Sequence, residues 1–226
     1  MKLQKLLFGS VIATLFAAST AFAGSFTVTG TNSDMEPVAA TANFTFGAGT
    51  LTLTLSNDIS ATDLRSAGQA LSDFSFTLAN GTTTGGTLTD LTGTTINIAA
   101  GGSVTPGTPV TSADWQLTAS NTSTFLLTAL FHAQPNFMIA PDGTSYPNVN
   151  ASIPNFNPYI QGSGTFTITG DFTASTTISA AAFSFGTGPE TIIPGVPGVP
   201  DSGATVALLG LAMVGLAAFR AKFRKA

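Results

Sequence analysis

The sequence predicts an all-β fold, an antiparallel β-sandwich of the jelly-roll or immunoglobulin-like class. Apolar and hydroxyl side chains alternate with a period of two along much of the chain. Glycine- and asparagine-containing turns separate these segments at short intervals. There is no cysteine, so an exported domain must rely on burial of apolar side chains or on assembly. A closed barrel is the alternative architecture.

The clearest predicted element is a β-hairpin over residues 44–55. Two phenylalanines are followed by a glycine turn and by leucines that alternate with threonine: Phe44, Phe46, Gly47, Gly49, Leu51, Leu53 and Leu55. This pattern gives each strand one apolar face for the core and one hydroxyl face for water.

Further segments predict about eight to eleven strands in all. Shorter alternating stretches begin at Phe26, Phe74, Leu88, Trp115, Phe166 and Ile178. Residues 125–133 form a continuous apolar run, which predicts a strand buried on both faces, with a short helix as the alternative. Residues 59–71 predict a short helix, and the Pro-, Asn- and Gly-rich residues 135–158 predict a long irregular loop.

The N-terminus has the pattern of a cleaved signal helix. Lys2 and Lys5 precede an apolar run over residues 6–18, and Ala21 and Ala23 form a small-x-small cleavage site. We therefore predict a signal peptide over residues 1–23, with a retained anchor as the alternative. The exported body is then a single β domain over residues 24–187.

The C-terminus has three parts behind a Pro- and Gly-rich segment. Residues 188–198 predict an extended linker. A polar motif follows, made of Val199, Pro200, Asp201, Ser202 and Gly203. Residues 204–219 carry no charge and predict a transmembrane helix about 24 Å long. Cations then gather in residues 220–226, at Arg220, Lys222, Arg224 and Lys225, which predicts a cytoplasmic C-terminus. A buried core helix is the alternative.

Motif, apolar run and basic end, in this order, resemble a PEP-CTERM sorting signal of the variant that begins Val-Pro-Asp-Ser-Gly. The resemblance covers residues 199–226. It implies recognition by an exosortase, a membrane-embedded enzyme similar to a cysteine transpeptidase. It further implies that the inner membrane holds the protein transiently and that the protein then passes to the cell surface or to extracellular polysaccharide.

The charge distribution narrows the range of partners. The exported part of the chain, residues 24–198, has one cation, Arg65, and ten acids, so its formal charge is −9. Nucleic acids and anionic membrane surfaces are therefore poor partners. Arg65 is expected to pair with Asp58 or Asp63.

The body shows no catalytic signature. His132, its one histidine, lies in the apolar run and has no nucleophile motif beside it. The carboxylates are scattered and mostly fall at predicted turns. We therefore expect no catalytic residue, no cofactor and no enzyme.

Calcium binding is a lesser hypothesis. Carboxylate and amide oxygens suit this ion, and two sets of residues offer them: Asn57 and Asp58 with Asp63, and Asp142 with Asn148 and Asn150.

Taken together, these patterns predict a non-enzymatic bacterial surface protein, structural or adhesive in the envelope, biofilm or exopolysaccharide. One alternative is a glycan-binding module, with Tyr146 and Tyr159 on a loop rim. Without glycan binding, these tyrosines are expected to anchor the loop and Trp115 to lie in the core. Another alternative is a single-span membrane protein that is never processed.

Overall fold

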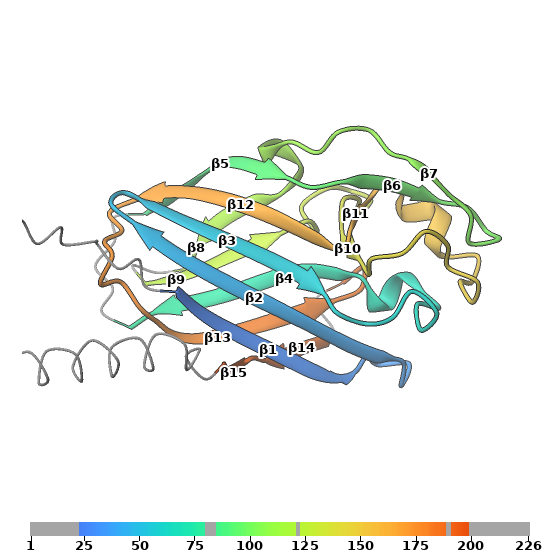
Figure 1. The fold of residues 1–226 in the computed structure, drawn as a ribbon, viewed down its shortest axis with the longest axis horizontal. Helices are drawn as coiled ribbons and strands as arrows, with labels where there is room; N and C mark the ends of the chain where they lie inside the picture. The colour runs from blue at the N-terminus through green and yellow to red at the C-terminus, as the bar shows by residue number, and fades with distance from the viewer. Residues whose placement is uncertain (1–22, 80–84, 121–122, 189–190, 199–226) are drawn as a thin grey trace, which may run out of the picture.

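Two β-sheets make up the body of the protein. The computed structural model describes residues 23–79, 85–120, 123–188 and 191–198. Over these residues the chain forms fifteen strands and three short 3₁₀ helices, so the predicted all-β class is confirmed. Over these residues the strands pair in two separate sheets. Figure 1 shows one sheet lying in front of the other.

The first sheet has six strands in the order β15-β1-β2-β3-β12-β5. Their bounds are Val196–Pro197 for β15, Ala23–Thr31 for β1, Pro37–Gly47 for β2, Thr50–Asn57 for β3, Ser163–Gly170 for β12 and Gly86–Thr92 for β5. All pairs are antiparallel, and Phe44 opposite Leu53 confirms the predicted hairpin register.

The second sheet has nine strands. Seven follow the order β14-β13-β4-β10-β11-β6-β7, and β9 joins β4 to β8 beside this path. The bounds are Thr191–Pro194 for β14, Ile178–Phe185 for β13, Leu71–Leu78 for β4, Ile139–Ala140 for β10, Tyr159–Gln161 for β11, Thr95–Ile98 for β6, Val104–Pro106 for β7, Gln116–Ala119 for β8 and Thr124–Thr128 for β9. The β10–β11 pair is parallel, whereas the other pairs are antiparallel.

Phenylalanine rings fill the space between the sheets. The Phe44 ring of β2 lies 5.8 Å from the Phe74 ring and 5.6 Å from the Phe76 ring, both of β4. Phe74 in turn contacts Phe183 of β13 at 4.9 Å. The apolar half of each alternating strand thus faces one shared core, as the period-two pattern predicts.

Two predicted elements are wrong. The segment 59–71 contains only the 3₁₀ helix η1, Ala67–Gln69. The Gln69 side chain completes the capping box of η1 with Ser66, and its Nε2 donates to the Pro37 carbonyl at 2.8 Å, so it ties this single turn to β2. The apolar run 125–133 is not a strand buried on both faces. β9 ends at Thr128, and only every second side chain of it is buried. Phe131 and His132, beyond its end, are exposed.

The predicted loop 135–158 is largely irregular, as expected. It contains the two-residue strand β10 and the 3₁₀ helix η3, Ile153–Phe156. The remaining 3₁₀ helix, η2 at Ser112–Asp114, precedes Trp115. The Trp115 indole is buried, and its Nε1 donates to the Phe137 carbonyl at 3.0 Å, so Trp115 is a core residue as predicted.

Candidate functional site

The segment that the sequence predicts to be a linker forms two strands of the body. Within residues 188–198, β14 pairs with β13 of the second sheet, with Ile193 opposite Phe183. The chain then crosses at Gly195, and β15 pairs with β1 of the first sheet, with Val196 opposite Thr27. We call residues 191–198 the strap because they connect the two sheets along one side of the body (Figure 1). The linker prediction is therefore wrong for these residues.

Close packing holds the strap in place. The Gly195 N–H donates to the Ala181 carbonyl at 2.8 Å, and a Cβ at Gly195 would lie 2.9 Å from the Phe183 ring. Ile193 belongs to β14 of the second sheet, but its side chain reaches Gly30 of β1 in the first sheet. A Cβ added to Gly30 would lie only 3.0 Å from the Ile193 Cδ1. At its end, the Gly198 N–H donates to the Ser25 carbonyl at 2.7 Å. The body therefore fixes the chain up to the residue before Val199.

A polar cavity of about 510 Å³ lies at the start of the strap. It is lined by the β1–β2 turn, η1, the loop before η3 and the end of β13, through residues that include Asp34, Ser66, Gly68, Asn150, Phe156, Phe185 and Thr191. Asn32 shapes the turn because its Oδ1 accepts hydrogen bonds from the Asp34 and Glu36 N–H groups at 3.0 and 2.9 Å. The cavity thus combines a carboxylate, an amide, hydroxyls and two aromatic rings.

The end of the chain matches a known family model. The model of the VPDSG-CTERM motif matches residues 198–223, beginning at the last residue of the strap. Residues 198–223 are a PEP-CTERM-type sorting signal. This signal implies export and processing by an exosortase-type enzyme at the membrane. No curated protein and no solved structure matches the chain.

Most sequence-predicted sorting residues lie outside the described residues. These are the motif Val199–Gly203, the apolar run 204–219, the basic end with Arg220, Lys222, Arg224 and Lys225, and the signal peptide with Ala21. Ala23 is the first residue of β1. The described part of the chain contains no helix with the length and hydropathy that a membrane crossing needs.

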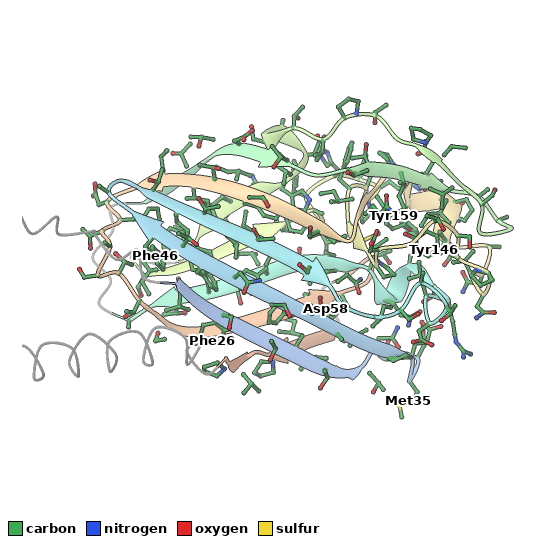
Figure 2. All side chains as sticks on the ribbon, viewed as in Figure 1. Phe26, Met35, Phe46, Asp58, Tyr146 and Tyr159 are labelled. Carbon is green, nitrogen blue, oxygen red and sulfur yellow. The ribbon has the colours of Figure 1, made fainter. Side chains whose placement is uncertain are left out.

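The two body tyrosines do not form a binding rim. Tyr146 and Tyr159 are fully buried at the same end of the body (Figure 2). Their hydroxyls donate to the Pro141 and Ile153 carbonyls at 2.7 and 3.0 Å, and burial raises the pKa of both phenols. They anchor the long loop against the body, so their predicted role in glycan contact is wrong.

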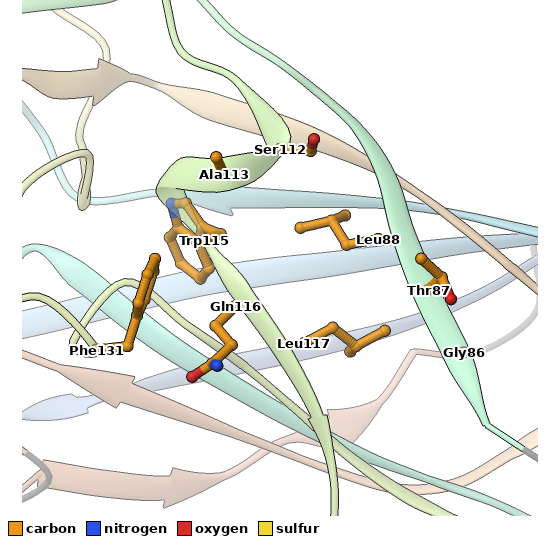
Figure 3. A pocket seen from close by; sticks show the side chains of 9 residues that line it. All are labelled: Gly86, Thr87, Leu88, Ser112, Ala113, Trp115, Gln116, Leu117 and Phe131. Atoms are coloured by element: carbon orange, nitrogen blue, oxygen red, sulfur yellow. The ribbon is translucent and has the colours of Figure 1, made fainter.

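A shallower groove lies on the opposite side of the body from the strap. It has a volume of about 430 Å³ and is bordered by β5, η2 and β8. Figure 3 shows Leu88 of β5 and Leu117 of β8 in this groove, with Phe131 near Trp115. The His132 ring lies tilted by 38° against the Phe131 ring, with centroids 3.9 Å apart, and His132 is exposed. His132 therefore lies on the surface and not in the core.

Part of each predicted calcium set borders one hollow. Asp58 and Asp142, one acid from each set, border a shallow hollow of about 400 Å³. The Asp58 Oδ2 accepts from the Thr41 hydroxyl at 2.6 Å, and the Asp142 Oδ1 accepts from the Gln161 amide at 3.0 Å. In the part of the chain that the structure describes, no three His, Cys, Asp or Glu side chains come together as metal ligands.

The expected ion pair of Arg65 with Asp58 or Asp63 is not formed. The Arg65 side chain is exposed, and its backbone carbonyl accepts from the Asn150 N–H at 2.6 Å. Arg65 thus helps to position the loop beside the polar cavity through its main chain. Sequence reasoning missed this cavity because it joins segments that lie far apart in the sequence.

Asp73 of β4 is a buried carboxyl without an assigned role. It is 7 % exposed, and its Oδ1 has no hydrogen-bond partner among the described residues. Burial raises the pKa of Asp73, and the neighbouring hydroxyls of Thr128 and Ser184 oppose this shift. Because the folded pKa exceeds the unfolded pKa, the stability contributed by protonated Asp73 is present below the unfolded pKa and is lost as pH rises.

We therefore expect Asp73→Asn to raise the free energy of unfolding at pH 7 by about 1 kcal/mol, because it removes a buried charge. The difference from the parent protein should shrink as pH falls through the raised pKa of folded Asp73, where the buried carboxyl becomes neutral. Urea denaturation at several pH values measures this. Asp90→Asn, at an exposed position of β5, is the control and should show no such trend. A stability loss in Asp73→Asn at pH 7 would contradict the assignment.

Proposed function

We propose that the protein is an exported, non-enzymatic bacterial surface protein that an exosortase-type enzyme processes at the membrane. Residues 204–219 hold it in the inner membrane with the C-terminus in the cytoplasm until residues 199–203 are processed. The body then serves a structural or adhesive role in the envelope, biofilm or exopolysaccharide. The observation that carries this proposal is the sorting-signal match over residues 198–223, which begins where the folded body ends.

The character of the body supports a role in an extracellular matrix. Its outward strand faces carry mainly threonine and serine, and the formal charge of −9 of residues 24–198 comes from scattered acids. Such a surface stays soluble and is a poor match for anionic partners. The non-enzymatic role rests on the sequence, which has no nucleophile motif. The assignment of the two sheets to the jelly-roll or immunoglobulin-like class stays a prediction.

Changing the motif tests the processing step. In cells that contain the enzyme, Pro200→Ala with Asp201→Ala should stop conversion of the full-length protein and keep it in the inner membrane. Membrane fractionation followed by immunoblotting measures the full-length and the shortened forms. The control is Ser56→Ala, a change on β3 of the body, which should convert at the parent rate. Normal conversion of the double variant would overturn the proposal.

Glycan binding is a second candidate function, and the polar cavity favours it. The Asn150 Oδ1 is used by Ser152, whose N–H and hydroxyl donate to it at 2.8 and 2.6 Å, and this leaves the Asn150 Nδ2 as a donor. The exposed Asp34 carboxylate is an acceptor at the same cavity, and Phe156 offers an apolar ring. Sugars present hydroxyls and an apolar face, which suit this combination.

We expect Asp34→Ala with Asn150→Ala to reduce retention on the exopolysaccharide of the producing cell at least tenfold, because two polar contacts are lost. A pull-down with the released protein measures this. Asp90→Ala, at an exposed position of β5 that does not line the cavity, is the control and should be retained like the parent protein. If the parent protein and the double variant are retained equally, the cavity is not the glycan site.

A further inference from the structure

The sorting motif begins directly at the folded body. The Gly198 N–H is hydrogen-bonded to the Ser25 carbonyl of β1, and Val199 is the next residue. Residues 199–203 separate Gly198 from the apolar run, and so short a segment spans at most about 20 Å when extended. An enzyme that binds this motif at the membrane must therefore come close to the strap.

The strap presents an apolar outer surface. Large hydrophobic side chains are exposed at four described positions, and Ile192 and Val196 of the strap are two of them, at 60 % and 65 % exposure. Pro194 and Pro197 are exposed beside them. Residues 191–200 contain no charged side chain. The apolar, uncharged surface thus continues from the strap into the start of the motif.

The backbone of the strap is also accessible on one side. β14 and β15 are the end strands of their sheets over the described residues, so each has one edge without a partner strand. The prolines at positions 194 and 197 remove two backbone donors, which discourages pairing with another sheet. Recognition through the exposed side chains is therefore favoured over recognition through strand addition.

We propose that the outer surface of the strap, centred on Ile192 and Val196, is a docking surface for the exosortase-type enzyme. It extends recognition from the five-residue motif into the folded body. The apolar side chains suit a membrane-embedded enzyme, whose surface near the bilayer is itself apolar. This inference rests on the proposed processing of the sorting signal.

The test compares conversion rates in cells that contain the enzyme. Ile192→Thr with Val196→Thr should slow conversion of the full-length protein about tenfold, because two apolar contacts are lost while threonine keeps the strand propensity. Phe131→Thr is the matched control, an exposed apolar residue on the other side of the body, and should convert at the parent rate. Thermal melting of the released proteins checks that both variants remain folded.

The outcomes separate this inference from the proposed function. An unchanged rate in the strap variant, with conversion blocked by Pro200→Ala and Asp201→Ala, would overturn the docking surface alone. A faster rate would also overturn it, because the strap would then need to detach and not to dock. A third outcome is that the strap variant is converted at the normal rate, and that the released parent protein self-associates whereas the released strap variant does not. This outcome would assign the surface to a second copy of the chain. Normal conversion of both the motif variant and the strap variant would overturn the proposed function itself.

Discussion

Phe44→Ala should lower the free energy of unfolding of the body by about 3–5 kcal/mol. The Phe44 ring is 1 % exposed and lies within ring-contact distance of four others, those of Phe26, Phe46, Phe74 and Phe76, at centroid separations from 5.6 to 6.3 Å. It therefore connects neighbouring strands of one sheet and both sheets to each other. A loss of this size is a large part of the roughly 5–15 kcal/mol that stabilises a typical domain.

Urea denaturation of residues 24–198 measures this effect. Phe131→Ala is the control, since that ring is 39 % exposed, and it should change the free energy of unfolding by no more than about 0.5 kcal/mol. Similar losses in the two variants would contradict the assignment of Phe44 to the centre of the core.

Ending the chain after Gly188 should destabilise the body by an amount on the order of 5 kcal/mol, whereas ending it after Gly198 should have little effect. The shorter chain loses the β13–β14 and β1–β15 hydrogen bonds and the burial of Ile193. It also uncovers the sides of Phe26 and Phe183, which Gly195 approaches closely. The strap would thereby be shown to belong to the folded body.

A pair of adjacent substitutions gives a finer test of the strap. Ile193→Thr should cost about 1–2 kcal/mol because Ile193 packs against the core, and Ile192→Thr should be nearly neutral because its side chain is 60 % exposed. Thermal or urea unfolding of the two variants measures the difference. Equal effects, or equal stability of the two truncated chains, would show that the strap does not stabilise the body.

Local pattern was sufficient to predict the strands with clear alternation and the side chains that they bury in the core. In residues 44–55, leucine and phenylalanine alternate with threonine, and alternation places every second side chain on the same face of a strand. Trp115 was likewise predicted to be buried. These successes depend on short-range periodicity, which does not require knowledge of how distant strands pair.

The strap could not be predicted from composition. Pro194 and Pro197 made residues 188–198 look incompatible with a sheet, yet the two prolines lie in end strands, where a missing backbone donor is tolerated. The sequence likewise left open whether Tyr146 and Tyr159 lie on a loop rim or anchor the loop, and the structure shows that they anchor it. A proline- and asparagine-rich loop is usually exposed, and only the tertiary fold decides which of its side chains anchor it.

The central claim is that the chain is processed at its sorting signal after the body has folded up to Gly198. Intact-mass spectrometry of the protein recovered from the surface or medium of cells that contain an exosortase-type enzyme tests it most directly. The account predicts a C-terminus within Val199–Gly203, with the strap retained and the apolar run removed. A C-terminus at Ala226, as expected for an unprocessed single-span protein, or one that lies before Thr191 would contradict it.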